Sequence, residues 1–164
     1  MLLLDAKTVA AIATGAGIGI GQGIARKLAA EGASVALHYA GSRQGAEEAV
    51  AAIEAEGGTA IAIPGDLRSA AECTRVVEEA IAALGGLDIL VNNAGVTRAQ
   101  SLGDTTEALY DEMFDLNMKG QFFCAQRAVA EMERTGGGSI VNITSVHGAA
   151  GGPNHAAYAA TKGA

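Results

Sequence analysis

Short apolar segments alternate with amphipathic segments along the whole chain, and this alternation constrains the fold more than any other feature. Strands that are apolar on both faces are predicted over residues 8–13, 34–39, 60–63, 89–91 and 139–144. Amphipathic stretches lie between them, near residues 21–31, 43–56, 70–84 and 106–134. Buried strands that are each followed by a helix are typical of a parallel sheet with right-handed crossovers. The pattern predicts an α/β fold, with a doubly wound parallel sheet in one domain over residues 1–164.

Glycines and capping residues mark the ends of the predicted helices. Glycines follow all four amphipathic stretches, at Gly32, Gly57-Gly58, Gly85-Gly86 and Gly136-Gly137-Gly138. Glycine is common just after the last turn of a helix. Ser69 with Glu72, and Asp104 with Glu107, have the spacing of an N-terminal capping box.

The fourth amphipathic stretch is long for a single helix of a globular protein. Within it, Gly120 follows Asn117-Met118-Lys119. A glycine in the middle of a helix costs roughly 1 kcal/mol relative to alanine. We therefore expect this helix to break near residues 117–120.

Composition limits the possible partners and the cellular location. The chain has 164 residues, is 49% hydrophobic and 18% charged, and carries a net charge of −7. The charge argues against binding nucleic acid or an anionic membrane surface, and no apolar run approaches the length of a membrane span. The Met1–Leu4 run is too short for a secretion signal. Cys73 and Cys124 lack metal-ligand spacing, so we expect reduced cysteines, no metal site and a cytoplasmic protein.

A glycine-rich turn stands where the first strand gives way to the first helix, in the run Thr14-Gly15-Ala16-Gly17-Ile18-Gly19-Ile20-Gly21. Missing side chains let such a turn close and let its backbone N–H groups approach a pyrophosphate at the positive end of the helix. The spacing G-x-x-x-G-x-G differs from the ordinary dinucleotide fingerprint G-x-G-x-x-G. The run predicts a dinucleotide cradle, and a tight turn without a ligand is the alternative. The candidate cofactor-binding residues here are Thr14, Gly15, Gly19, Ile20 and Gly21.

The residues after the second strand bear on which dinucleotide binds. An acidic residue at this place accepts a hydrogen bond from the ribose of NAD, whereas an arginine accommodates the 2′-phosphate of NADP. No acid occurs here before Glu47, while Ser42 and Arg43 follow the strand directly. This favours NADP over NAD. The alternative is that Ser42 caps the second helix and Arg43 is solvated.

Polar residues also follow the third and fourth strands. Asp66 comes after the third strand, and Asn92-Asn93-Ala94-Gly95 comes after the fourth. The carboxyl ends of strands are where open α/β sheets bind ligands, although Asp and Asn are also common turn formers.

Tyr158 and Lys162 are four residues apart, so a helix places them on one face. A cation one turn away from a phenol favours the ionised phenol, which suits the pair to proton transfer. Ser145 follows the fifth strand, and Asn117 falls within the fourth amphipathic stretch. Taken singly, a serine at a strand end and an asparagine at a helix break need no function, but the order of all these features indicates one.

Together these features resemble the short-chain dehydrogenase/reductase family, in the type that catalyses with Asn, Ser, Tyr and Lys. The resemblance covers the whole chain and implies a Rossmann-like fold. It rests on matching spacing in Thr14-Gly15-x-x-x-Gly19-x-Gly21, Asn92-Asn93-Ala94-Gly95, Ser145 and Tyr158-Ala-Ala-Thr-Lys162. Within the family the chain is similar to 3-oxoacyl-(acyl carrier protein) reductases and glucose 1-dehydrogenases, partly through Tyr39-Ala40-Gly41-Ser42. Ile18 departs from the family, which often has a basic residue there that helps select NADP.

The resemblance implies an NAD(P)-dependent oxidoreductase that interconverts a small carbonyl compound and an alcohol. It implies that Tyr158 transfers the proton, that Lys162 assists it and holds the nicotinamide ribose, that Ser145 binds the substrate oxygen, and that Asn117 positions a water. Tyr158 is also expected, with Lys162, among the cofactor-binding residues. On the cofactor side it implies Asp66 and Leu67 beside the adenine, and Asn93, Ala94 and Gly95 along its ribose. It also implies a homo-oligomer, either a dimer or a tetramer.

The length of the chain departs from the family pattern. Family members continue past the tyrosine helix with two further strands, so we expect this chain to be the N-terminal portion of a longer NAD(P)-binding domain. The tyrosine helix would have only about two turns, and isolated short helices are marginal in water. We therefore expect the 164-residue chain to be inactive alone. The alternatives are a non-catalytic nucleotide-binding module and a half-fold that needs a complementary chain.

Overall fold

A parallel sheet forms the middle layer of the computed structural model, which describes residues 9–164. Its strands are β1 (Ala10–Ala13), β2 (Ser34–Tyr39), β3 (Thr59–Pro64), β4 (Ile89–Asn92) and β5 (Ser139–Asn142). The strand order is β3-β2-β1-β4-β5, and every neighbouring pair is parallel. The chain winds outward from β1 first to one side and then to the other. This order confirms the predicted doubly wound, Rossmann-like α/β fold.

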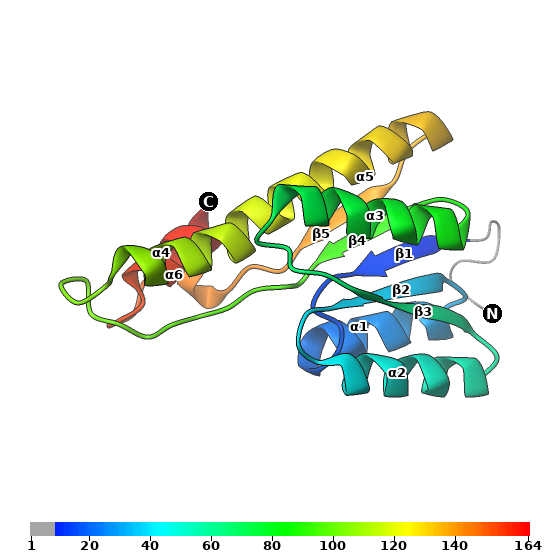
Figure 1. Cartoon of the computed structure of the whole chain (residues 1–164), viewed down its shortest axis with the longest axis horizontal. Coiled ribbons are helices and arrows are strands. Elements are labelled where there is room, and N and C mark those ends of the chain that lie inside the picture. Colours follow the sequence, from blue (N-terminus) through cyan, green and yellow to red (C-terminus); the bar gives the residue numbers. More distant parts are fainter. Residues whose placement is uncertain (1–8) are drawn as a thin grey trace.

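Helices cover both faces of the sheet (Figure 1). On one face lie α1 (Gly19–Ala30) and α2 (Arg43–Ala55), and on the other lie α3 (Ala70–Leu84) and α5 (Gln121–Thr135). Two shorter helices, α4 (Glu107–Phe114) and α6 (Ala156–Gly163), lie beyond the carboxyl ends of the strands, at the left of Figure 1. Both short helices therefore lie at the carboxyl edge of the sheet.

Strands β1, β2 and β4 are largely buried on both sides because their side chains alternate between two apolar clusters. The expected burial of the fifth strand is wrong, because β5 lies at the edge of the sheet and is exposed at three of its four residues. Ile12 and Leu90 pack with α3 and α5, whereas Ala11, Val35 and Leu37 pack with α1 and α2. Successive side chains of a strand point to opposite faces, so a strand between two helix layers must be apolar at every position. This explains why the strands are short continuous apolar runs rather than alternating patterns.

The observed helix ends agree with most of the predicted ones. The Ser69 hydroxyl accepts a hydrogen bond from the Glu72 N–H and caps α3, as its spacing predicts. The cap predicted at Asp104 is wrong, because α4 begins at Glu107 and the Thr106 hydroxyl caps it by accepting from the Leu109 N–H. The Asp104 carboxylate instead accepts from the Ser101 hydroxyl.

The predicted break in the fourth helix is a π-helical turn over Asp115–Gly120, which joins α4 to α5 without interrupting the helical path. Extra residues in such a turn displace side chains from the regular helical positions, and they are frequent at functional sites. The fifth strand ends at Asn142, two residues before the predicted end. Thr8 and Met1–Leu4 lie outside the described residues. In the part of the chain that is described, no helix combines the length and apolar character needed to span a bilayer.

We expect Gly120→Ala to destabilise the protein, because a Cβ at Gly120 would lie 2.8 Å from the carbonyl oxygen of Leu67. The backbone must shift to relieve this overlap, so the free energy of unfolding should fall by about 1–3 kcal/mol. Gly23→Ala is the matched control, because Gly23 is a helical glycine of α1 with open space where its Cβ would stand. That variant should gain up to about 1 kcal/mol. Urea unfolding followed by circular dichroism measures both, and a stabilised Gly120→Ala variant would contradict the close contact.

Candidate active site

A hollow of about 640 Å³ opens at the carboxyl ends of β1, β2, β3 and β4. Its position beside β1, where the winding of the sheet changes sides, is where open α/β sheets bind ligands. Among its lining residues are the predicted Gly15, Ser42, Asp66, Leu67, Asn93, Ala94 and Gly95. It is also lined by His38, Arg68 and Arg98, which the sequence did not single out.

The glycine-rich turn borders this hollow, and its glycines serve different purposes. Gly15 and Gly19 have φ values of +62° and +60°, in the left-handed region that favours glycine. Nothing lies within 4 Å of where a Cβ on Gly19 would stand, so the turn leaves room there. A Cβ on Gly21 would lie 2.4 Å from the Asn93 side-chain nitrogen. Two glycines therefore shape the turn, and the third allows α1 to approach the end of β4.

The first turn of α1 directs unpaired backbone N–H groups towards this edge of the sheet. The helix begins at Gly19, and Ile18 occupies the N-cap position without a side-chain hydrogen bond. A helix start without a capping side chain keeps N–H groups free, and the helix dipole is positive there. The adjoining Ile20 is 70% exposed. The free N–H groups and the positive end of the helix dipole therefore favour binding of a phosphate at the start of α1.

Thr14 ties the end of β1 to the end of β4. Its hydroxyl oxygen accepts hydrogen bonds from the N–H groups of Asn93 at 3.0 Å and Ala94 at 2.9 Å. The Asn93 side-chain amide returns two hydrogen bonds, to the carbonyl oxygens of Thr14 at 2.9 Å and Gly15 at 3.2 Å. Thr14 is 1% exposed, so these groups have little access to water as a substitute.

The turn after β2 packs tightly against the glycine-rich turn. A Cβ on Gly17 would lie 2.0 Å from the Ser42 hydroxyl oxygen, and a Cβ on Gly45 would lie 2.1 Å from the Gly17 carbonyl oxygen. The Gln22 side-chain amide joins the two segments by donating hydrogen bonds to the carbonyl oxygens of Gly17 at 3.2 Å and Gly45 at 2.9 Å. Gly17, Gln22 and Gly45 are residues that sequence reasoning missed, because their contacts join two segments that are distant in the chain.

The two residues predicted to select the dinucleotide lie at the start of α2. Ser42 occupies the N-cap position, but its side chain accepts no capping hydrogen bond. The Arg43 guanidinium lies 2.7 Å from the Glu47 carboxylate, and both side chains are largely exposed. Arg43 can therefore exchange this ion pair for another anion at small cost, because exposed ion pairs are weak.

Asp66 and Leu67 follow β3. The Arg68 guanidinium donates to both Asp66 carboxylate oxygens, at 2.9 Å and 2.6 Å. These hydrogen bonds hold the pKa of Asp66 below its ordinary value. The Leu67 side chain is buried and its carbonyl oxygen accepts from the Cys73 thiol, so the floor of the hollow is fixed to α3.

The four predicted catalytic residues come from different elements at the same edge of the sheet. Asn117 lies in the π-helical turn and is fully buried. Its side-chain oxygen accepts from the Val96 N–H at 2.8 Å, and its nitrogen donates to the Val96 carbonyl at 2.9 Å and the Thr161 hydroxyl at 3.0 Å. Asn117 thereby joins the segment after β4 to α6, the helix that carries Tyr158 and Lys162.

Lys162 ties α6 to the end of β5. Its ammonium group donates to the Ile143 carbonyl at 2.8 Å, and its own carbonyl accepts from the Thr144 hydroxyl at 2.7 Å. A Cβ on Gly95 would lie 3.4 Å from the Lys162 nitrogen, so the ammonium group also faces the end of the dinucleotide hollow. Partial burial lowers the pKa of Lys162 from its ordinary value.

Ser145 and Tyr158 both contact a stacked pair of histidines, His147 and His155. The Ser145 hydroxyl oxygen accepts from the His147 N–H at 3.2 Å and caps a short 3₁₀ turn. The His147 and His155 rings are stacked at 4.8 Å, and both meet the Tyr158 ring edge-on, at 5.9 Å and 6.2 Å. The structure therefore brings the Asn117 side chain and the Lys162 ammonium group together beside Gly95. It also sets Tyr158 against His147 in the 3₁₀ turn over Val146–Gly148.

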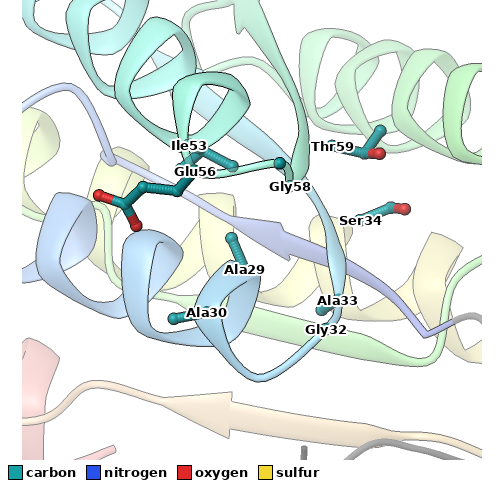
Figure 2. Close-up of a pocket in the computed structure, with 10 residues that line it drawn as sticks. Ala29, Ala30, Gly32, Ala33, Ser34, Ile53, Glu56, Gly58 and Thr59 are labelled. Carbon is teal, nitrogen blue, oxygen red and sulfur yellow. The ribbon is translucent and has the colours of Figure 1, made fainter.

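A second hollow, of about 370 Å³, opens at the opposite edge of the sheet (Figure 2). It lies between the last turns of α1 and α2 and the first residues of β2 and β3, and most of its lining side chains are alanine and glycine. The carboxyl ends of helices carry partial negative charge, and Glu56 stands there with Arg26 3.7 Å away. This charge disfavours a pyrophosphate, so the hollow at the carboxyl edge is the candidate cofactor site. Within residues 9–164, no group of three or more His, Cys, Asp or Glu side chains could hold a metal ion.

Comparison with known proteins agrees with this geometry. The family model for short chain dehydrogenases matches residues 9–164. The 3-oxoacyl-[acyl-carrier-protein] reductase FabG of Staphylococcus aureus is 44% identical over 155 residues, which are 94% of this chain and 63% of that protein.

Two solved structures are also similar to this chain. Acetoin dehydrogenase YohF from Salmonella typhimurium has a TM-score of 0.92 at 35% identity, covering 96% of this chain and 62% of that one. A short chain dehydrogenase from Burkholderia cenocepacia in complex with NADP has a TM-score of 0.89 at 38% identity, covering 94% and 63%. The chain thus spans less than two thirds of the length of these relatives.

We expect Thr14→Val to destabilise the junction between β1 and β4, because the half-buried Ala94 N–H loses its acceptor, whereas the Asn93 N–H keeps a second acceptor in the Val91 carbonyl oxygen at 3.1 Å. Each unsatisfied buried donor costs about 1–3 kcal/mol. Thr14→Ser keeps the hydroxyl oxygen and loses one methyl group, which should cost only about 1 kcal/mol. Urea unfolding of the two variants measures the difference, and equal stability of both would show that the hydroxyl is dispensable.

Proposed function

This chain belongs to the short-chain dehydrogenase family, and from that premise we propose that it carries the cofactor site and proton-transfer residues of an oxidoreductase that interconverts a carbonyl and an alcohol. The observation that supports this best is the convergence at one edge of the sheet. The hollow lined by Gly15, Asn93 and Gly95 meets the Lys162 ammonium group at that edge.

The residues of the hollow fit a nicotinamide dinucleotide. The open space beside Gly19 at the start of α1 leaves room for a pyrophosphate against free backbone N–H groups. Asp66 and Leu67 would flank the adenine, and Asn93, Ala94 and Gly95 would line its ribose. The bound dinucleotide supplies hydride transfer to or from the reacting carbon. The protein's part is therefore to hold this group and to move one proton.

Proton transfer falls to Tyr158 in this proposal. Its phenol oxygen donates a proton to the substrate oxygen during reduction and removes it during oxidation. Lys162 would assist this transfer with its ammonium group, which lies at the end of the hollow beside Gly95. Ser145 would hold the substrate oxygen by a hydrogen bond.

Asn117 has a positioning task in this proposal. Both ends of its side-chain amide are occupied, by Val96 and Thr161. The side chain therefore holds α6 in place, and in this proposal Asn117 also positions the water that serves Lys162. The substrate in this proposal is a small carbonyl compound or alcohol, and the protein assembles as a homo-oligomer.

NADP is the proposed cofactor. Ser42 lines the hollow and Arg43 follows it at the start of α2, so we assign these two residues to the 2′-phosphate. The solved short chain dehydrogenase from Burkholderia cenocepacia, which is similar to this chain, contains NADP. Arg43 is held only by an exposed ion pair with Glu47, so it can turn to a phosphate.

We expect Tyr158→Phe to lower the turnover of the full-length protein by about 10²–10⁴, the usual contribution of a general acid or base. Dinucleotide affinity should fall by less than about tenfold, because the substitution removes at most one neutral hydrogen bond to the cofactor. Consumption of NADPH with acetoin or acetoacetyl thioesters as probes measures turnover. Tyr110→Phe is the matched control, because Tyr110 lies on α4, is 45% exposed and stacks on Phe114. Unchanged turnover in Tyr158→Phe would refute the assignment.

We expect Arg43→Gln to weaken NADP⁺ binding by about tenfold, the loss of one charge-assisted hydrogen bond, and to leave NAD⁺ binding unchanged. Arg26→Gln is the control, because Arg26 pairs with Glu56 beside the hollow at the opposite edge. Isothermal titration calorimetry with both dinucleotides gives the affinities. An equal loss for NAD⁺ and NADP⁺ would show that Arg43 supports the fold of the turn rather than the 2′-phosphate.

A further inference from the structure

His38 is a buried titratable residue that the proposed reaction does not use. It lies in β2, is 2% exposed and lines the dinucleotide hollow. Its Nδ1 atom lies 3.2 Å from the Gly15 backbone nitrogen, and its Nε2 atom lies 3.1 Å from the Gly65 carbonyl oxygen. One imidazole therefore bridges the glycine-rich turn after β1 and the turn after β3, which form two walls of the same hollow.

The two partners determine the protonation state of this ring. A backbone N–H can only donate, so Nδ1 must be the acceptor from Gly15. A backbone carbonyl can only accept, so Nε2 must carry the proton that is donated to Gly65. Both hydrogen bonds exist only in the neutral ring protonated on Nε2. A second proton, on Nδ1, would face the Gly15 N–H and break that contact.

The Gly15 contact matters because Gly15 has little freedom. Its φ is +62°, and a Cβ there would lie 2.9 Å from the Ala94 Cα atom. Its carbonyl oxygen accepts from the Asn93 side chain. The imidazole holds the N–H side of the same residue. Gly15 is therefore held from both sides beside Ala94, another lining residue of the hollow.

We propose that His38 is a positioning residue whose neutral imidazole holds the two walls of the dinucleotide hollow together, and that uptake of a proton by this ring releases Gly15 and weakens dinucleotide binding. This inference rests on the proposed function for the identity of the ligand. It assigns to the chain an acid-sensitive control of cofactor binding, located in β2 rather than among the residues that contact substrate.

The surroundings of the ring favour the neutral form. Burial is the main cause that lowers the pKa of His38 from its ordinary value, and the Arg75 cation of α3 acts in the same direction. The hydrogen bond to Gly65 and the carboxylates of Asp66 and Glu72 act in the opposite direction. Arg75 is itself paired with Glu72 at 2.9 Å and Glu79 at 2.6 Å. The charges facing the ring therefore offset one another, and burial prevails.

Because the pKa of His38 is lowered in the folded chain, acidification destabilises the fold. The unfolded chain binds the His38 proton more readily than the folded chain does. The stability that neutral His38 contributes is therefore complete above the ordinary histidine range near pH 6.5 and is lost as the pH falls from there towards the lower pKa of the folded state.

The first test needs no cofactor. Nitrogen-15 and proton NMR of the chain should show the His38 ring neutral and protonated on Nε2 at pH 8, with His38→Asn used to assign its signals. On acidification, the amide proton of Gly15 should shift with the same midpoint as the His38 ring. A Gly15 amide that does not respond, or a ring protonated on Nδ1, would overturn the proposal.

The second test compares binding of NAD⁺ and NADP⁺ in the wild type and in His38→Asn, from pH 8 down to at least one pH unit below the His38 midpoint that the NMR titration gives. The asparagine oxygen can still accept from Gly15 but cannot titrate, so its affinity at pH 8 should fall by less than about tenfold, the loss of one neutral hydrogen bond. Relative to this variant, wild-type affinity should fall by about tenfold for each pH unit below the His38 midpoint. The comparison cancels the titration of the NADP 2′-phosphate.

The outcomes separate the two proposals. An equal pH dependence of the wild type and His38→Asn would overturn the role of His38, even if both bind dinucleotide. If neither binds at any pH, the proposed cofactor site fails, and the NMR result then decides whether His38 holds the turn. His38→Leu, which removes both hydrogen bonds, should bind more weakly than His38→Asn at pH 8, and equal binding would contradict the contact with Gly15.

Discussion

The hydrogen bonds of the Thr14 hydroxyl hold the centre of this structure, because they join the two strands between which the sheet changes its winding direction. β1 and β4 are neighbours in space but are separated by two complete strand–helix units in the chain. Their carboxyl ends must remain in register if the turns that follow them are to form one site. A single buried oxygen accepts from both N–H groups after β4, and the Asn93 side chain closes the contact from the other side.

The same principle recurs around the hollow, where polar side chains satisfy backbone groups of distant turns. The His38 side chain forms hydrogen bonds with backbone groups of Gly15 and Gly65. Gln22 does so with Gly17 and Gly45, and Asn117 does so with Val96. Backbone groups in turns lack the partners that helices and sheets provide, and a buried one without a partner is costly. Side chains that meet this need also fix where the turns lie. The stability of the fold and the shape of the site are therefore set by the same contacts.

The sequence predicted the parts of the fold that depend on local pattern. Continuous apolar runs identified the strands, and Ser69 identified the start of α3. The prediction at Asp104 was wrong although residue type and spacing both favour Asp104 over Thr106 as the cap, because the Asp104 carboxylate accepts from the Ser101 hydroxyl and α4 starts two residues later than expected from this cap. The contacts of Gly17 with Ser42 and of His38 with Gly65 lay beyond local reasoning for another reason. They depend on how closely β1, β2 and β3 approach, which only the packed sheet determines.

The cofactor half and the proton-transfer half of the site differ in how they are held. The hollow for the dinucleotide is surrounded by strands and long helices whose side chains lie in two extensive apolar clusters. The helix that carries Tyr158 and Lys162 has eight residues, and within the described chain Thr161 is its one buried side chain. Its place is fixed by hydrogen bonds from Asn117, Thr144 and Lys162 rather than by apolar burial. Hydrogen bonds contribute little net stability but demand accurate geometry, so these three contacts determine the orientation of α6 and of Tyr158, the proposed proton donor, while the sheet supplies the stability.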